Sequence, residues 1–457
     1  MKSLKQKISI LIFLSLPFLC FGQDAEFLKI ENPADLCMFA LENNTQVQLC
    51  KTEYKSASKY VTGTYISFLP LLKFEGGIDY IQKEGFDFKN PEYWYVSAEL
   101  SQKIPGVGTL YLSPVMTHQK EYNFSLDYKF VQTTFPFWYK WAAKNPETQI
   151  PKLARNKSEL ELYEVKFDTI DSVLNLLRNY KQSLFAMDVV NKKVELYKEQ
   201  VLSYEEIIKA QGGSWMDYFE AQKTLNDYEK QRDEIESELM DLELELRNLL
   251  CISCSKEDFN LVIQKCLFCD QKEWTKLFIS YFPEWNNDFN SEIQIEKLMT
   301  IKEQSEAEYL FKRENLAPQF YIEGNINYTK DNRHDVVMSV GFDLSGLFSA
   351  EKYSYKTDYK ENKITYEKKI ESYKASLKNQ REFYIETLSK KTEEYNQKKN
   401  EVEARRKIFM DFTELYKANR CTKLDYMEAE ILYFQTWYNF IILEDELTYY
   451  KLLLSVL

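Results

Sequence analysis

The sequence predicts a mainly α-helical chain with two short groups of β-strands, built as a tandem repeat. Three observations support this fold class. Glycine (12) and proline (11) are scarce among the 457 residues, which favours long uninterrupted helices. Apolar residues recur at helical spacing through residues 151–250 and 350–457. A short segment in which polar and apolar residues alternate strictly, typical of a half-buried strand, occurs twice.

The two alternating segments are copies of each other. PLLKFEGGIDY begins at Pro70, and PQFYIEGNINY begins 248 residues later at Pro318, with Pro, Glu, Gly, Ile and Tyr in register. One face of each segment is apolar, and the other face is polar. Taken alone, this pattern also fits a soluble sheet with one solvated face. The polar faces carry the following charged and amide residues: Lys73, Glu75, Asp79, Glu323, Asn325 and Asn327.

A second pair of copies marks two corners between helices. AQGGSWMDYFEAQ begins at Ala210, and ANRCTKLDYMEAE begins 208 residues later at Ala418. The two spacings differ by 40 residues, so the first half contains that many extra residues between its strand and its corner. We expect the insertion within residues 94–134, as an added β-hairpin. Each half then contains, in order, a helix, strands, a very long helix, a tight corner and a long helix.

The N-terminus predicts export from the cytoplasm. Residues 1–22 combine three lysines with an apolar run from Ile8 to Leu19 and a small residue, Gly22, which is the pattern of a cleaved secretory signal. Cys20 raises lipid attachment as an alternative, although the residues before it are bulky for a lipoprotein signal. The mature chain contains no further apolar run of about 18 residues, so we expect no membrane-spanning helix. A chain of this kind that crosses a membrane must do so as a closed β-barrel.

The first repeat is expected to occupy residues 23–250. Within its strand region, Pro114 is expected to end a short strand that contains Leu110 and Leu112. The opening helix, the strand region and the two long helices are expected at residues 32–60, 71–134, 151–210 and 215–250.

The second repeat is expected to occupy residues 290–457 and to follow an irregular connection at residues 251–289. Its helix, strand pair and two long helices are expected at residues 291–315, 319–345, 350–418 and 423–457.

The connection carries two Cys-x-x-Cys pairs, separated by eleven residues. This spacing resembles a four-thiolate zinc site. An exported protein instead favours disulfides across the two pairs. Disulfides, a metal site and free thiols therefore all remain open for Cys251, Cys254, Cys266 and Cys269.

A soluble coiled coil would explain the long helices but not the strands that precede them. An isolated hairpin is at best marginally stable, so these strands must pair with others. A ring of strands with an apolar outer face and a polar inner face is a transmembrane barrel. One chain has too few strands to close such a ring, whereas three chains with four strands each would supply twelve.

These features together resemble the TolC family of outer-membrane channel proteins over nearly the whole mature chain. The resemblance rests on the strand copies after Pro70 and Pro318 and on the corners at residues 210–222 and 418–430. Residues 36–49 are also similar to the opening helix of that family. The resemblance implies a homotrimer with a β-barrel in the outer membrane, continued by an α-helical tunnel in the periplasm, with residues 251–289 at the equator. The barrel would have twelve strands, or eighteen if the extra residues add two strands to each chain.

The same resemblance implies a passive exit duct for a tripartite efflux pump or a type I secretion system. Its partners would be a periplasmic adaptor protein, which opens the helical tips, and an inner-membrane transporter. A non-pore periplasmic scaffold or adaptor is the alternative. The net charge of −12 argues against nucleic-acid binding. No nucleophile motif or phosphate-binding loop is present, so we expect neither enzymatic activity nor a cofactor.

Two sets of residues are expected to carry function. The polar residues of the strand copies would line the pore and set its charge. At the corners, glycines permit a tight turn with positive φ. Asp217 and Asp425 lie in the first turn of the next helix, where they act either as helix caps or as ionic contacts that hold the entrance shut. By the resemblance, the periplasmic tip and adaptor contact would comprise Gly212, Gly213, Ser214, Asp217, Arg420, Thr422 and Asp425.

Overall fold

The computed structural model describes most of the chain. Within the described residues, no helix combines the length and the hydrophobicity that crossing a bilayer requires. The predicted signal at residues 1–22, with Cys20, lies outside them. The structure describes residues 26–79, 93–104, 108–119, 121–132, 146–210, 212–281, 289–315, 319–329, 334–344 and 351–454.

The chain forms two compact units, each assembled from segments that are distant in the sequence. The first unit comprises Met1–Leu49, Tyr163–Ile293 and Ala375–Leu457. The second comprises Cys50–Leu162 and Gln294–Lys374.

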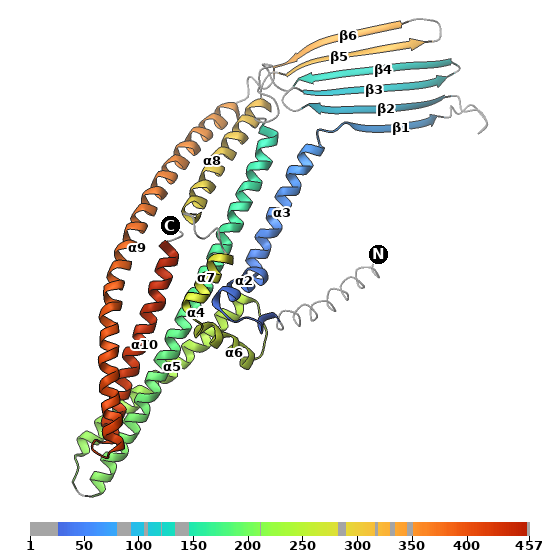
Figure 1. Cartoon of the computed structure of the whole chain (residues 1–457). Coiled ribbons are helices and arrows are strands. Elements are labelled where there is room, and N and C mark those ends of the chain that lie inside the picture. The colour runs from blue at the N-terminus through green and yellow to red at the C-terminus, as the bar shows by residue number, and fades with distance from the viewer. Residues whose placement is uncertain are drawn as a thin grey trace. The chain divides into compact units, whose positions relative to one another are not determined.

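The second unit contains one antiparallel sheet of six strands in chain order, β1 to β6 (Figure 1). Because β4 pairs with β5, the strands of the two repeats form a single sheet. The sequence left four or six strands per chain open, and the described residues form six, so the inserted residues form strands and not an elaborated loop. The strands are β1 (Leu71–Asp79), β2 (Tyr93–Ile104), β3 (Gly108–Gln119), β4 (Glu121–Gln132), β5 (Gln319–Thr329) and β6 (His334–Asp343).

The expectation that Pro114 ends a strand is wrong. Strand β3 continues through Pro114, which lies opposite Leu126 of β4. On the other side, the pairing of β2 with β3 stops at Ser97 and resumes at Leu100. Proline lacks an N–H donor, so it interrupts one ladder locally while the rest of the strand stays paired on both sides.

Four helices belong wholly or partly to the second unit. They are α3 (Thr45–Ile66), α4 (Pro146–Lys209), α8 (Phe289–Asn315) and α9 (Glu351–Lys417). Helix α4 begins five residues before the expected start at Pro151, which lies within its second turn. Within this unit, α8 contacts α9 through a Lys302–Glu367 ion pair of 2.8 Å and parallel rings of Tyr309 and Tyr359.

The first unit packs short helices against long ones around a small apolar core. Its short helices are α2 (Pro33–Asn43), α6 (Lys256–Leu267) and α7 (Gln271–Tyr281). Its long helices are α5 (Trp215–Leu250), α10 (Lys423–Leu454) and the parts of α4 and α9 that do not belong to the second unit. The fully buried side chains of this unit include Phe27, Leu36, Ile170, Val173, Leu246, Phe259, Ile263 and Phe278.

The helix expected over residues 32–60 is two helices, divided at Asn44. Asn44 has extended backbone angles and ends α2. Its Oδ1 atom accepts hydrogen bonds from the N–H groups of Gln46 and Val47, so the same residue caps α3. Its Nδ2 atom donates to the carbonyl of Leu249 at the end of α5. Asn44 therefore fixes α2, α3 and α5 together, and the sequence pattern alone does not reveal this role.

The expectation that residues 251–289 form an irregular connection is also wrong, because they contain helices α6 and α7. Ser255 caps α6 by accepting a hydrogen bond from the N–H of Asp258 at 3.1 Å. The spacing of the cysteines suggested a cross-linked loop. In the structure, Cys266 is instead one residue of the apolar stripe that α6 buries. The buried residues of this stripe are Phe259, Val262, Ile263, Cys266 and Leu267.

Three glycines of the sheet lie directly opposite tyrosines of a neighbouring strand. The pairs are Gly77 with Tyr95, Gly324 with Tyr128, and Gly341 with Tyr321. A Cβ atom at any of these glycines would overlap the tyrosine ring, so the ring lies over the bare glycine backbone. A Cβ atom at the adjacent Gly76 would meet only a backbone oxygen, at 3.6 Å.

Gly77→Ala should therefore destabilise the sheet by about 1–3 kcal/mol, because the Tyr95 ring must move. Gly76→Ala is the matched control and should have little effect. Denaturant unfolding of the purified protein in detergent measures both. Combining Gly77→Ala with Tyr95→Ala removes the overlap, so the double variant should show no additional loss beyond Tyr95→Ala alone. Equal losses for Gly76→Ala and Gly77→Ala would contradict this account.

Candidate functional site

The six strands separate charged and apolar side chains onto opposite faces of the sheet. The register places Leu72, Leu100, Leu112, Tyr128 and Gly324 in one row across β1 to β5. Every described Lys, Asp and Glu side chain of the strands lies on the opposite, polar face. These residues are Lys73, Glu75, Glu99, Lys103, Asp127, Lys129, Glu323, Asp335 and Asp343.

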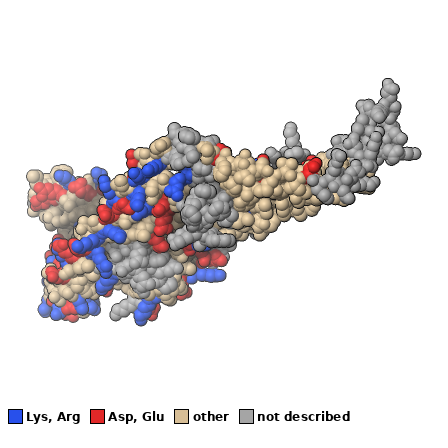
Figure 2. Space-filling view, turned by 90° about the horizontal axis from the view of Figure 1, so that it is seen from above, with Lys and Arg blue, Asp and Glu red and all other residues tan. Residues whose placement is uncertain are grey.

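The apolar face is exposed in the single chain. Phe74 is 74% exposed and Val336 is 64% exposed, although both are large hydrophobic residues. Figure 2 shows the strand region as a band in which hardly any charged side chain is visible, whereas charged side chains are dense over the helices. An exposed apolar surface of this kind marks an interaction with lipid or protein.

Ion pairs and hydrogen bonds on the polar face follow the strand register. Lys73 and Glu99 are directly opposite, with 3.7 Å between Nζ and Oε2. Lys129 and Glu323 are also opposite, at 3.1 Å, and join β4 to β5. In the next row, the Asn325 amide donates to the Asp127 carboxylate across the same strand pair. Ser339 of β6 donates to Glu323 at 3.3 Å, so this network continues to the sheet edge.

The predicted pore residues share the polar face but do not form one cluster. Lys73 and Glu75 lie on β1, whereas Glu323, Asn325 and Asn327 lie on β5. Asp79 is the last residue of β1, and its side chain lies outside the described part of the structure. A depression of about 340 Å³ on this face is lined by residues of β3 to β6, including Asp127, Lys129, Glu323 and Asn325.

Sequence reasoning missed four participants of this network: Glu99, Asp127, Lys129 and Ser339. Their alternation was visible, but the partner of each strand was unknown. Only the pairing of β2 with β1, of β4 with β5 and of β6 with β5 brings these side chains beside the predicted ones. Among the described side chains of this face, six carboxylates stand against three lysines, so the face is acidic.

The corner between α4 and α5 is tight because of Gly213. The N–H of Gly212 donates to the carbonyl of Ile207 at 3.2 Å, which closes the end of α4. A Cβ atom on Gly213 would lie 2.9 Å from a side-chain carbon of Ile208. The expectation of positive φ at these glycines is wrong, since neither has it. Gly213 is required for close approach to the last turn of α4 and not for a left-handed backbone.

The corner between α9 and α10 uses a different device. Asn419 adopts the left-handed conformation with φ of 54°, and the N–H of Arg420 donates to the carbonyl of Leu415 at 2.8 Å. Thr422 and Asp425 then cap α10 reciprocally. The Asp425 N–H donates to Thr422 Oγ1 at 3.1 Å, and the Thr422 N–H donates to the Asp425 carboxylate at 3.0 Å. The Thr422 hydroxyl also donates to this carboxylate at 2.6 Å, and this hydrogen bond, together with the one from the Thr422 N–H, lowers the pKa of Asp425.

The duplicated corner residues therefore differ in role. Of the two roles considered for Asp425, a helix cap or an ionic contact at the entrance, the structure shows the helix cap. Ser214, the counterpart of Thr422, makes no capping hydrogen bond through its side chain. The first corner instead exposes an aromatic cluster of Trp215, Tyr218 and Phe219, whose ring centroids are 5.6 to 6.1 Å apart. Sequence reasoning missed this cluster, although WMDYF follows the glycines directly.

Polar contacts connect α4 to α10 along the first unit, like the rungs of a ladder. Each rung joins a charged residue to a charged residue or a tyrosine, and all five distances are 3.0 Å or less. The rungs are Asp171–Tyr449 (2.7 Å), Lys181–Asp445 (2.7 Å), Asp188–Tyr438 (2.6 Å), Lys192–Glu430 (3.0 Å) and Glu199–Lys423 (2.6 Å).

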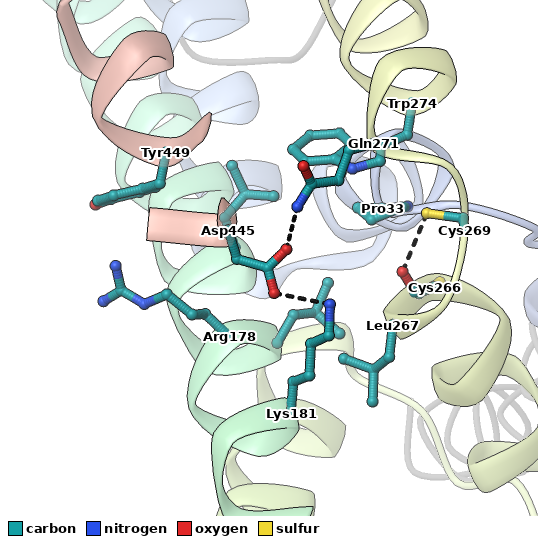
Figure 3. Close-up of a pocket in the computed structure, with 12 residues that line it drawn as sticks. Pro33, Arg178, Lys181, Cys266, Leu267, Cys269, Gln271, Trp274, Asp445 and Tyr449 are labelled. Carbon is teal, nitrogen blue, oxygen red and sulfur yellow. Dashed lines mark hydrogen bonds and ion pairs between the residues drawn. The ribbon is translucent and has the colours of Figure 1, made fainter. Parts of the chain in front are cut away.

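The end of this ladder that contains Lys181–Asp445 and Tyr449 borders a small pocket of about 80 Å³ (Figure 3). The side chains of Lys181 and Asp445 are only 12% and 18% exposed there. Gln271 of α7 also donates to Asp445, which connects the ladder to the short helices. Burial and the hydrogen bond to Asp188 raise the pKa of Tyr438, and burial and Asp171 do the same for Tyr449.

The cysteines of the connection are free thiols in the structure, as are the other described cysteines. Burial raises the pKa of Cys37 and Cys266, and it raises the pKa of Cys269 to about 11. Metal binding and disulfide exchange both require thiolates, so burial disfavours both reactions at Cys266 and Cys269. No group of three or more metal-ligating side chains occurs within the described residues.

Comparison with solved structures identifies the fold. The chain superposes on the outer-membrane channel OprN with a TM-score of 0.56 and 12% identity, covering 96% of this chain and 91% of that one. For the Campylobacter jejuni outer-membrane channel CmeC the values are 0.58 and 13%, with 94% and 86% covered. For the Vibrio cholerae outer-membrane protein VceC they are 0.53 and 12%, with 92% and 94% covered.

No protein-family model matches the sequence, and no curated protein matches it. The similarity is therefore one of structure at low sequence identity. The resemblance to TolC-family outer-membrane channels, inferred above from the duplicated strands and corners, is confirmed at the level of the fold.

The ladder predicts a stability effect at Tyr438. Tyr438→Phe removes the donor to Asp188 and leaves a partly buried carboxylate with one partner fewer, so it should cost about 1–3 kcal/mol of unfolding free energy. Tyr433→Phe is the control, because its ring stacks on Phe409 and no hydrogen bond of its hydroxyl is formed within the described residues. Thermal unfolding of both variants checks this, and equal destabilisation would argue against the ladder.

The two corners predict different responses to loss of the capping hydroxyl. Thr422→Ala should speed hydrogen exchange of the first α10 amides roughly five-fold, whereas Ser214→Ala should leave α5 unchanged. Because the pKa of Asp425 is lowered in the folded state, its contribution is present above the unfolded pKa of about 4 and is lost at lower pH. The difference between wild type and Thr422→Ala should therefore shrink as the pH falls below about 4. A difference of unchanged size in acid would contradict the contribution of the Asp425 carboxylate, since only the hydrogen bond from the Asp425 N–H to Thr422 Oγ1 is independent of its ionisation.

Proposed function

We propose that the chain is the subunit of a homotrimeric outer-membrane channel that serves as the exit duct of a tripartite efflux pump or a type I secretion system. One observation carries the proposal: the sheet exposes an uncharged apolar face and collects its charges on the other, in a chain with the fold of outer-membrane channels. A barrel that lies in lipid and encloses water requires this separation.

The apolar face would contact lipid. Aromatic rings lie near both ends of its strands, where a bilayer meets water. At one end, Trp94 stacks on His118, with Tyr122 4.5 Å from His118 between ring centroids. At the other end, Phe320 and Phe342 are 5.2 Å apart. Strands of 9 to 12 residues are long enough to cross the hydrocarbon layer when tilted.

The polar face would line the pore, and the helices would continue it into the periplasm. Within the first unit, α4 contacts α5 through Lys198 and Glu229, and α10 contacts α9 through Glu446 and Lys391. Among the four long helices α5, α4, α10 and α9, which contact each other in that order, α5 and α9 are therefore the outer two. Both keep large apolar side chains exposed. We propose that these faces pack against neighbouring subunits of the trimer; they include Met240, Leu244, Ile364, Phe383, Ile385 and Met410.

The two corners would form the periplasmic tip, where an adaptor protein docks and opens the duct. Gly212, Gly213 and Ser214 with Arg420 and Thr422 belong to this tip, together with Asp217 and Asp425. The chain itself would be a passive conduit, so an inner-membrane transporter must supply the energy for export.

Purified protein in a planar bilayer tests the proposal. We expect heat-resistant oligomers in the outer-membrane fraction and discrete conductance steps in the bilayer. A monomer in the soluble periplasmic fraction without channel activity would instead support the alternative, a non-pore scaffold or adaptor.

The acidic polar face predicts a preference for cations. Within the described residues, Glu75 and Asp335 form no ion pair with a lysine or arginine, so Glu75→Gln with Asp335→Asn should lower the cation-to-anion permeability ratio. The control is Glu257→Gln with Glu273→Gln, which removes two exposed carboxylates of α6 and α7 and should leave the ratio unchanged. Reversal potentials in asymmetric salt measure the ratio, and identical values for both variants would exclude a pore-lining role for β1 and β6.

A further inference from the structure

The two additional strands keep the pattern of the sheet. Strands β2 and β3 have 12 residues each and pair along almost their whole length with β1, with each other and with β4. Their charged residues, Glu99 and Lys103, lie on the polar face, and Trp94, Val96, Leu110 and Leu112 lie on the apolar face. An inserted loop that lay outside the barrel wall would have no need for this alternation.

The sheet ends in two unprotected edge strands. Within the described residues, β1 pairs only with β2, and β6 pairs only with β5. Both edges are long, contain no proline and expose apolar side chains such as Phe74, Met338 and Phe342. Native proteins avoid such edges, because the free N–H and C=O groups recruit further strands.

The number and the direction of the strands determine what can cover these edges. The six strands alternate in direction, so β1 and β6 run oppositely. Strand β6 of one copy can therefore pair in antiparallel fashion with β1 of the next copy. The apolar face then continues onto an apolar face and the polar face onto a polar face. A second copy of this chain satisfies all these conditions at once.

We infer that three copies close a ring of eighteen strands, to which the inserted pair of strands contributes six. This inference rests on the proposed trimeric channel and adds the width of its exit. Barrel diameter grows roughly in proportion to strand number, so eighteen strands give about 1.5 times the diameter of twelve. The corresponding cross-section is about twice as large, and barrels of 16–18 strands enclose an open aqueous channel. The exit would admit polymer-sized solutes that a ring of twelve strands excludes.

Polymer exclusion in planar bilayers tests the width. Neutral polyethylene glycols of increasing size are added to wild type and to a variant that lacks residues 93–119. This deletion removes β2 and β3, and it leaves β1 and β4 antiparallel because β1 ends and β4 begins at the same end of the sheet. Wild type should admit polymers of about 1.5 times the diameter accepted by the variant. Equal cut-offs would overturn the inference.

A second measurement covers the case in which the deletion variant does not assemble. A photo-crosslinking residue in place of Phe74 in the full-length chain should yield covalent dimers and trimers, with the cross-link mapped to β6 of another copy. Capture of β6 within the same chain, or of the β2–β3 region of another copy, would overturn the ring of eighteen strands. A wild-type chain that forms no channel at all would refute the proposed function itself, which is a distinguishable outcome.

Discussion

The register in which β4 meets β5 is the constraint on which the rest of the sheet depends. This pairing joins segments almost 200 residues apart, and their polar contacts fix it: Lys129 with Glu323, and Asp127 with Asn325. Side chains alternate along a strand, so a slip by one residue would move the charges of β5 and β6 to the apolar face. Exposed ion pairs stabilise little in themselves. Their larger contribution is to select one register, because a slip by one residue leaves charged groups among hydrophobic ones and a slip by two residues moves Lys129 away from Glu323.

In the first unit, specificity comes from a different kind of polar contact. Helices α4 and α10 meet along surfaces with small apolar clusters, for example Val189 and Leu196 with Ile431. Such surfaces could slide by a helical turn at little loss. The five rungs from Asp171–Tyr449 to Glu199–Lys423 each match one donor with one acceptor, and a shifted pairing would leave the more buried charges, such as Lys181 and Asp445, without partners. The ladder therefore sets the axial register of the two helices.

Much of the fold could be predicted from periodicity and duplication, and the failures have physical causes. The bounds of α5, 215–250, were predicted as observed, and α8, α9 and α10 differ by at most a few residues, because glycine, proline and periodicity mark helix ends strongly. Helices α6 and α7 were missed because the cysteine spacing suggested a cross-linked loop. The break at Asn44 depends on a contact with Leu249, which lies 205 residues away, so no local pattern contains it. Of the polar face, the residues on the duplicated strands were predicted, whereas Glu99 and Lys129 required the strand pairing.

The two corners show how a duplicated segment can diverge in mechanical behaviour. One copy has the closed Thr422–Asp425 cap and a left-handed Asn419, which hold the start of α10 by hydrogen bonds. In the other copy, a backbone hydrogen bond from Gly212 closes α4 and Gly213 fits closely against Ile208, but the side chain of Ser214 does not cap the start of α5. A helix start without a side-chain cap frays more readily than a capped one. An equal load on both corners would therefore deform the helix pair α4–α5 more than the helix pair α9–α10. The first corner would act as a compliant hinge, and the second would stay stiff.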